Sequence, residues 1–295
     1  MMTTVLEQLM SEAKQMENNI AGFLKAHGKI RRMRYPDHDS LVFFIGGDYD
    51  WESLNDDALR AQNRLHRELS AWLERAELLA SVMTPDAKSE FESGGKALLD
   101  IVCMNSSLYS DSIGQVIAGV TLGVGELVSI LDRSDDQAAG RNIFLPDTNA
   151  LLSNPAVEFW RFGATKFELV LLPTVLSELD NLKVAGRTEM LREKAAGLIK
   201  RLKGLRGRGP IRDGVPLSSG WSTMRWIAAE PKFGQTLSWL VPDNNDDRII
   251  ASVLEVMMNC PRSSVVLVTS DINLQNKAEF AGVRFDEPPE SDNKA

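Results

Sequence analysis

The chain has 295 residues, 43% hydrophobic and 25% charged, which is the composition of a soluble globular protein with one large domain or two ordinary ones. Its formal net charge of -8 excludes a protein that coats nucleic acid by bulk attraction, although a local basic patch is compatible with it. The N-terminal segment contains acids and no apolar signal core, so we expect a cytoplasmic protein.

The first part of the chain has the periodicity of amphipathic helices. Apolar residues recur at spacings of three and four through residues 6–23 and 65–83, and a third helix is predicted over residues 86–103. The apolar stretch 113–131 predicts a fourth. Its internal acid Glu126 would cost about 2.5–3.5 kcal/mol in a bilayer, so we expect a buried core helix and no membrane span.

These helices predict an all-α domain over residues 1–135, which would mediate self-association or bind a regulatory partner. Residues 136–142 gather Asp, Gly and Asn without periodicity and are predicted to be a linker. Downstream, short apolar runs alternate with helical patterns, as in a parallel α/β sheet. The runs are NIFLP, KFELVLLP, SWLVP and SSVVLVTS. The predicted α/β domain covers residues 143–286, and residues 287–295 are predicted to be a disordered tail.

Acidic residues follow these strand-like runs. Asp147 follows the first run, Asp271 follows the last, and Asp246 and Asp247 come shortly after SWLVP. Glu178 shares an apolar helix face and is one position away from a capping-box site. Each of the four aspartates also fits a structural role in a helix cap or a turn, whereas Glu178 fits such a role poorly. Together they predict a cluster, because the carboxyl ends of parallel strands meet at one edge of the sheet.

The chemistry of such a cluster is constrained by the absence of histidine. The three histidines, His27, His38 and His66, all precede the α/β domain, which excludes a Ser/His/Asp triad or a histidine-rich zinc site there. Clustered carboxylates repel one another unless a cation binds them. Oxygen ligands suit Mg²⁺ or Mn²⁺, and these ions act on phosphate groups.

The ordered motifs PDTNALL, PTVLSELDNL, NNDDRIIASVL and VTSDINLQNKA resemble those of PIN-domain nucleases over residues 142–286. The resemblance implies a three-layer α/β/α sheet and a metal-dependent endoribonuclease that leaves a 5′-phosphate and a 3′-hydroxyl. It does not extend to the helical part. The segment from residue 183 to 241 is longer than a minimal member of the family needs, which leaves room for a lid or a substrate-binding insertion.

Carried over by position, the resemblance assigns Asp147, Glu178 and Asp271 as catalytic metal ligands. The third acid of the motif series is ambiguous, because Asp246 and Asp247 both have tolerable register, with Asp247 slightly better. Asn149 and Asn273 would support the ligands or orient a water.

A basic segment offers contacts for the nucleic acid. Residues 183–212 contain ten Lys or Arg but only two acids, Glu189 and Glu193. A helix with an apolar stripe would expose cations that bind phosphates without regard to sequence. The alternative is a solvated helix face with no partner. The predicted contacts to single-stranded RNA, or to DNA, are Arg187, Arg192, Lys194, Lys200, Arg201 and Lys203.

Two other readings stay open. The domain could be a catalytically degenerate fold that binds nucleic acid or acts as a scaffold, although the acids are present at all the motif positions. It could also be a metal-dependent phosphohydrolase of small molecules, for which the basic helix has no evident use.

Overall fold

The computed structural model describes residues 3–32, 49–105, 108–109, 111–134, 139–164, 166–210, 213–217 and 222–290. The chain divides into two compact units, residues 6–134 and a second unit made of residues 1–5 and 135–295. Residues 136–138 of the predicted linker and residues 291–295 of the predicted tail lie outside the described residues.

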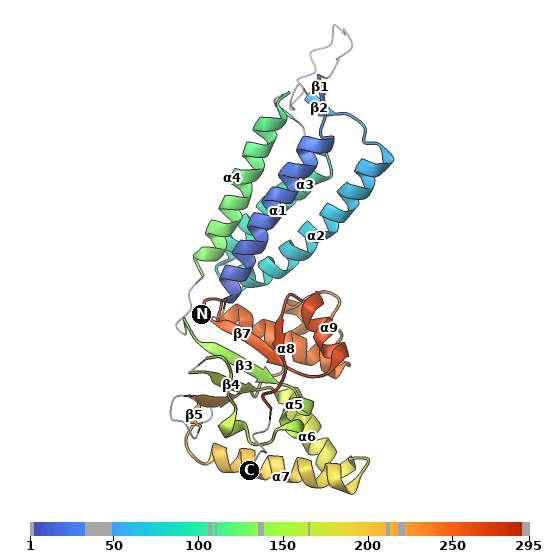
Figure 1. Cartoon of the computed structure of the whole chain (residues 1–295). Helices are drawn as coiled ribbons and strands as arrows, with labels where there is room; N and C mark the ends of the chain where they lie inside the picture. The colour runs from blue at the N-terminus through green and yellow to red at the C-terminus, as the bar shows by residue number, and fades with distance from the viewer. Residues whose placement is uncertain are drawn as a thin grey trace. The chain divides into compact units, whose positions relative to one another are not determined.

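The first unit is built from long helices that lie side by side (Figure 1). They are α1 (Val5–His27), α2 (Asp56–Ser81), α3 (Pro85–Val102) and α4 (Ile113–Asp132), and a short antiparallel pair, β1 (Ile30–Arg32) and β2 (Tyr49–Trp51), follows α1. Asn55 and Thr84 cap α2 and α3 by accepting from backbone amides of the first turns. In the core, Trp72 donates to the Leu9 carbonyl at 3.1 Å. The helical prediction for this part of the chain is confirmed.

The expectation of a buried core helix at residues 113–131 is wrong for most of its surface. Helix α4 buries one face, which carries Val120, Val124 and Leu127, whereas Leu122 is 70% exposed. By length and composition α4 could cross a membrane, and 22% of its most apolar window is buried. The sequence pattern misled because the solvent-facing side carries mostly small residues and few charges.

In the second unit, the described residues contain a six-stranded sheet of order β5-β6-β4-β3-β7-β8. Neighbouring strands are parallel, except that β5 pairs antiparallel with β6. Central strands β3 and β7 pair from Asn142 with Ser264 to Pro146 with Val268. The strands are β3 (Asn142–Pro146), β4 (Glu168–Leu171), β5 (Val215–Pro216), β6 (Thr223–Trp226), β7 (Ser264–Val268) and β8 (Arg284–Asp286).

Helices connect these strands and pack against the sheet (Figure 1). Strand β4 is buried along its whole length and β7 likewise, which explains why both appear in the sequence as continuous apolar runs. The α/β prediction with helix-flanked parallel strands is confirmed. The helical segments are α5 (Thr148–Ser153), η1 (Val157–Phe159), α6 (Pro173–Ala185), α7 (Glu189–Arg206), η2 (Phe233–Gln235), α8 (Asn245–Asn259) and α9 (Ile272–Phe280).

One predicted strand is wrong. SWLVP forms a turn in which Leu240 donates to the Leu237 carbonyl and Asn244 to that of Val241. Pro242 has no amide to give to a sheet, and the amide of Val241 is used by the Asp247 side chain. The strand beside β4 is instead β6, from the segment predicted to hold a lid or insertion.

Candidate active site

The order of the strands directs attention to the carboxyl ends of β3 and β7. The chain passes from β3 to β4 on one side, and β7 returns on the other side of β3. In parallel sheets such a reversal leaves a crevice beyond the ends of the two strands. Asp147 directly follows β3, and Asp271 follows β7 after two residues. Both acids therefore stand where a ligand of this sheet would bind.

A cavity of about 380 Å³ opens at this edge, and carboxylates from distant parts of the chain line it. Asp147 comes from the end of β3, Glu178 from α6, Asp246 from the first turn of α8 and Asp271 from the start of α9. The other lining residues are Thr148, Asn149, Asn181, Leu182, Asn245, Ile249 and Leu274. The structure thus brings four of the predicted acids to one pocket.

Asp147 is buried, with 3% of its surface exposed, and both of its carboxylate oxygens are hydrogen-bonded. Oδ1 accepts from the amide of Ala150 at 2.6 Å, which makes Asp147 the N-cap of α5. Oδ2 accepts from the hydroxyl of Thr269 at 2.5 Å. A capping role and a ligand role are compatible here, because each carboxylate oxygen retains a lone pair.

Asp271 is held in a similar way at the start of α9. Its Oδ1 accepts from the amides of Asn273 at 2.8 Å and Leu274 at 3.2 Å. Its own amide donates to the Thr269 hydroxyl at 3.0 Å. Thr269 is fully buried and therefore joins the two acids rigidly through one oxygen atom.

Glu178 is half-buried on α6 and is not unpaired, as its apolar neighbours in the sequence suggested. It accepts from the Thr148 hydroxyl, and from the side-chain amide Nδ2 of Asn245 at 2.7 Å. The contact with Asn245 links α6 to the first turn of α8. Glu178 is therefore oriented by the residue after Asp147 and the residue before Asp246.

The structure places Asp246, rather than Asp247, beside the other acids. The Asp247 carboxylate is buried away from the pocket, where Oδ1 binds Lys277 at 2.7 Å and Oδ2 accepts from the amide of Val241 at 3.0 Å. The slight preference of the sequence for Asp247 does not fit this geometry. A helix turns by about 100° per residue, so Asp246 reaches the pocket while Asp247 is buried beside it, and Lys277 contacts both.

Burial raises the pKa of the Asp147 carboxyl. The hydrogen bonds from Thr269 and Ala150 oppose this shift, while the charges of Asp271 and Glu178 add to it. The charges of these two acids thus disfavour the ionised form of Asp147. A bound cation would remove the same repulsion.

The donor set fits a hard divalent cation. Carboxylates and amide oxygens line the pocket, and such oxygen ligands suit Mg²⁺ or Mn²⁺. Among the described residues, no three acidic, histidine or cysteine side chains lie close enough together to enclose an ion as they stand. Mg²⁺ usually keeps several waters and needs only one or two direct carboxylates, so a wider, solvated acidic pocket suits it. The metal role of each acid remains a prediction.

Of the two asparagines predicted to support the ligands, Asn149 lines the pocket and Asn273 does not. Asn149 is exposed and lines the pocket. Asn273 is exposed on α9 and contributes its backbone amide to the cap of Asp271, while its side chain is not part of the lining.

The predicted basic residues also separate into exposed and engaged groups. Arg187, Lys194, Lys200 and Lys203 are exposed on α7 and the turn before it. Arg192 donates to the Gly186 carbonyl at 2.7 Å and pairs with Glu189. Arg201 was expected on an open face, but it forms a forked ion pair with Glu158, with Nε 2.9 Å from both carboxylate oxygens. That pair anchors α7 to η1, so the guanidinium of Arg201 is engaged within the domain, and its contact with a phosphate stays a prediction.

Sequence reasoning missed the residues that orient the acids, namely Thr148, Thr269, Asn245 and Lys277. Thr148 and Asn245 are immediate neighbours of motif acids, and Thr269 lies two positions before Asp271. Adjacency to an acid was the available signal. It could not indicate that Thr148 and Asn245 bind the same carboxylate, since that contact exists only after α5, α6 and α8 have packed.

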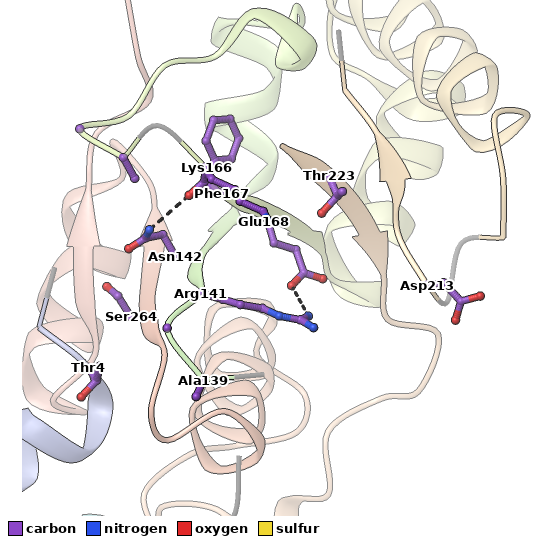
Figure 2. A pocket seen from close by; sticks show the side chains of 13 residues that line it. Thr4, Ala139, Arg141, Asn142, Lys166, Phe167, Glu168, Asp213, Thr223 and Ser264 are labelled. Carbon is purple, nitrogen blue, oxygen red and sulfur yellow. Dashed lines mark hydrogen bonds and ion pairs between the residues drawn. The ribbon is translucent and has the colours of Figure 1, made fainter. Parts of the chain in front are cut away.

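A larger cavity, of about 820 Å³, lies at the opposite edge of the sheet, where β3, β4, β6 and β7 begin. Figure 2 shows Glu168 and Arg141 facing each other there, 3.2 Å apart. Glu168 is buried and also accepts from Arg225 at 2.6 Å. This acid is thus neutralised by two arginines, and the amino ends of parallel strands are not their usual binding edge. The acidic pocket is therefore the better candidate for chemistry.

Comparison with known proteins agrees with this geometry. Residues 144–287 match the sequence model of the PIN domain. The human transcriptional protein SWT1 is 27% identical over 178 residues, which cover 54% of this chain and 18% of that protein. The chain therefore spans less than a fifth of this relative's length. The match begins within β3 and ends just after β8, so it includes every acid of the pocket. The C-terminal half of this chain is a PIN domain.

Proposed function

We propose that this protein is a metal-dependent endoribonuclease that cleaves single-stranded RNA at the pocket formed by Asp147, Glu178, Asp246 and Asp271. The observation that supports it best is the convergence of these acids, which come from separate segments of the chain, at the carboxyl edge of the sheet. The carboxylates of such a cluster repel one another, and a bound divalent cation would offset that repulsion.

When bound, Mg²⁺ or Mn²⁺ would neutralise the phosphodiester and lower the pKa of a water. The role of the chain is to hold the ion and to keep the acids in fixed positions around it. Asp147 is the most buried of the four acids, and Ala150 and Thr269 donate to both of its carboxylate oxygens. Glu178 and Asp246 lie on different helices, so the cation would bind across α6 and α8.

The RNA would reach the pocket along α6 and α7. Asn181 and Leu182 of α6 line the pocket, and the exposed cations Lys183 and Arg187 follow them in the chain. Lys194, Lys200 and Lys203 continue the exposed basic surface along α7. Such lysines bind phosphates without reading bases, which suits a strand of any sequence.

The direct test incubates the full chain with end-labelled single-stranded RNA and Mn²⁺ or Mg²⁺. We expect cleavage that EDTA abolishes, with a 5′-phosphate on the downstream product. Changing a group that merely orients a ligand costs about 10–100-fold in activity or metal affinity, so Asp147→Asn and Glu178→Gln should each lose at least that much. Asp180→Asn is the matched control, because Asp180 is an exposed acid on the same helix as Glu178.

The same experiment distinguishes the competing functions. Binding of RNA without metal-dependent cleavage would make the domain a nucleic-acid-binding module. Hydrolysis of a chromogenic phosphomonoester with no action on RNA would make it a small-molecule phosphohydrolase. A parallel reaction with single-stranded DNA of the same sequence tests the choice of RNA. Equal RNA cleavage by the wild type and both pocket variants would contradict the proposed site.

A further inference from the structure

Lys277 is a cation placed directly behind the acidic pocket. It lies on α9, six residues after Asp271, which corresponds to about 9 Å along the helix. Its ammonium is 2.7 Å from Oδ1 of Asp247, 3.2 Å from Oδ1 of Asn244 and 3.4 Å from Oδ2 of Asp246. The contacts with Asp247 and Asn244 are hydrogen bonds, and the contact with Asp246 is an ion pair.

All of these partners belong to one turn of backbone, the start of α8. Asn244 is the N-cap of that helix and accepts from the amides of Asp246 and Asp247. Asp247 is buried and also holds the amide of Val241, in the turn before the helix. Lys277 therefore contacts the cap, the pocket acid and the buried acid of this turn simultaneously.

Helix α9 thus contacts two acids of the pocket. Its N-cap is Asp271 itself, and its Lys277 binds the turn that carries Asp246. The Lys277 side chain is 26% exposed and that of Asp247 is 8% exposed, so water screens this contact less than an ordinary surface pair. A movement of α8 relative to α9 would break the contact and widen the gap between the two pocket acids.

We infer that Lys277 is a positioning residue for the metal-binding acids. It holds the first turn of α8 against α9 and so sets the separation between Asp246 and Asp271 at which a divalent cation binds. This inference rests on the proposed function, since it concerns the same pocket. It assigns Lys277 no contact with the substrate.

A purely electrostatic role for Lys277 predicts the opposite result. A fixed positive charge near a cation site repels the cation, so removing it alone would strengthen metal binding. Removing a positioning group weakens metal binding because the acids lose their spacing. The direction of the change in affinity therefore separates the two roles.

The test measures Mn²⁺ binding to the full chain from the paramagnetic resonance signal of free Mn²⁺, with no RNA present. Lys277→Met keeps an unbranched side chain as far as Cε and removes the ammonium. We expect the dissociation constant for Mn²⁺ to rise about 10-fold or more, as for other groups that orient metal ligands. Lys277→Arg keeps the charge and should give an intermediate value. Lys232→Met is the matched control, because Lys232 is exposed and lies outside the pocket lining.

Lys277→Met leaves the buried Asp247 without its cation, which could unfold the turn. The double variant Asp247→Asn with Lys277→Met removes both charges and leaves an amide oxygen for Val241. We expect it to unfold at nearly the wild-type temperature and still to bind Mn²⁺ about 10-fold more weakly or worse. Unchanged or tighter Mn²⁺ binding by this folded variant would overturn the positioning role.

RNA cleavage measured on the same samples separates this inference from the proposed function. A wild-type chain that binds Mn²⁺ without cleaving RNA would contradict the nuclease and leave the role of Lys277 standing. Cleavage by the wild type with equal Mn²⁺ affinity in the Met variant would contradict the role of Lys277 alone. A wild-type chain that binds no Mn²⁺ would overturn both.

Discussion

The hydroxyl of Thr269 donates to Oδ2 of Asp147 across 2.5 Å, although the two residues are 122 positions apart in the chain. The same hydroxyl accepts from the amide of Asp271. One buried oxygen therefore links the end of β3 to the start of α9, and it holds two acids of the pocket at a defined spacing. The spacing of these two acids therefore depends on this contact.

Thr269→Val should destabilise the protein by about 1–3 kcal/mol, because a buried carboxylate oxygen loses its donor while the shape of the side chain is kept. Urea unfolding monitored by circular dichroism measures this. Thr269→Ser retains the hydroxyl and should recover most of the loss. A valine variant as stable as the wild type would mean that the hydrogen bond contributes nothing net.

Asp147→Asn should raise stability at neutral pH in the presence of EDTA. Burial raises the pKa of Asp147 in the folded protein, so the native state favours the protonated form. Below the pKa of Asp147 in the unfolded chain, about 3.9, the protonated group contributes its full stability. This contribution is lost as the pH rises through the higher pKa that Asp147 has in the folded protein. Asparagine does not ionise, so the variant escapes that loss.

Thermal unfolding of the wild type and Asp147→Asn at a series of pH values measures the direction of this difference in stability. We expect the variant to unfold at a higher temperature at pH 7, by about 2–4 °C for each kcal/mol gained. The difference should shrink as the pH approaches 4. A difference that is constant over the whole range would exclude ionisation of Asp147 as its cause.

Asp246→Asn and Asp247→Asn should have different effects, although the two residues are adjacent. Asp246 lines the pocket, so its variant should lose Mn²⁺-dependent RNA cleavage and keep its stability. Asp247 is buried against Lys277, so its variant should lose about 1–3 kcal/mol of stability as the charge-assisted hydrogen bond weakens. Calorimetry measures the stability of both variants, and the cleavage assay measures their activity. A stable Asp247→Asn protein that loses far more cleavage than Lys277→Met would restore Asp247 as the ligand.

Lys200→Gln and Arg201→Gln form a second adjacent pair with opposite expectations. Lys200 is exposed, so its loss should weaken RNA binding and lower the slope of log affinity against log salt by about 0.7. Arg201 pairs with the mostly buried Glu158, and after allowance for its partial exposure its loss should cost about 1–2 kcal/mol of stability. Filter binding at several salt concentrations and urea unfolding measure both. If Arg201→Gln changes only the salt slope, Arg201 is a phosphate contact after all.

Sequence patterns were sufficient for the class of fold and the positions of most elements. Helical spacing of apolar residues predicts α2 and α3 because a helix that packs on one side repeats every three to four residues. Continuous apolar runs predict β3, β4 and β7 because helices cover both faces of a parallel sheet. SWLVP has the same apolar composition but forms a turn. Pro242 has no amide for a sheet, and the amide of Val241 donates to the carboxylate of Asp247.

The sequence by itself determined the α/β class of the C-terminal half and predicted the chemistry proposed for it, since four motif acids without a nearby histidine leave oxygen ligation of a hard cation as the main option. Only the tertiary structure decided that Asp246 enters the pocket while Asp247 turns toward Lys277, and that Arg201 is paired with Glu158. The physical reason is that the rotation of a helix about its axis is set by long-range packing. The direction of each side chain on its first turns therefore follows from contacts with segments far away in the chain.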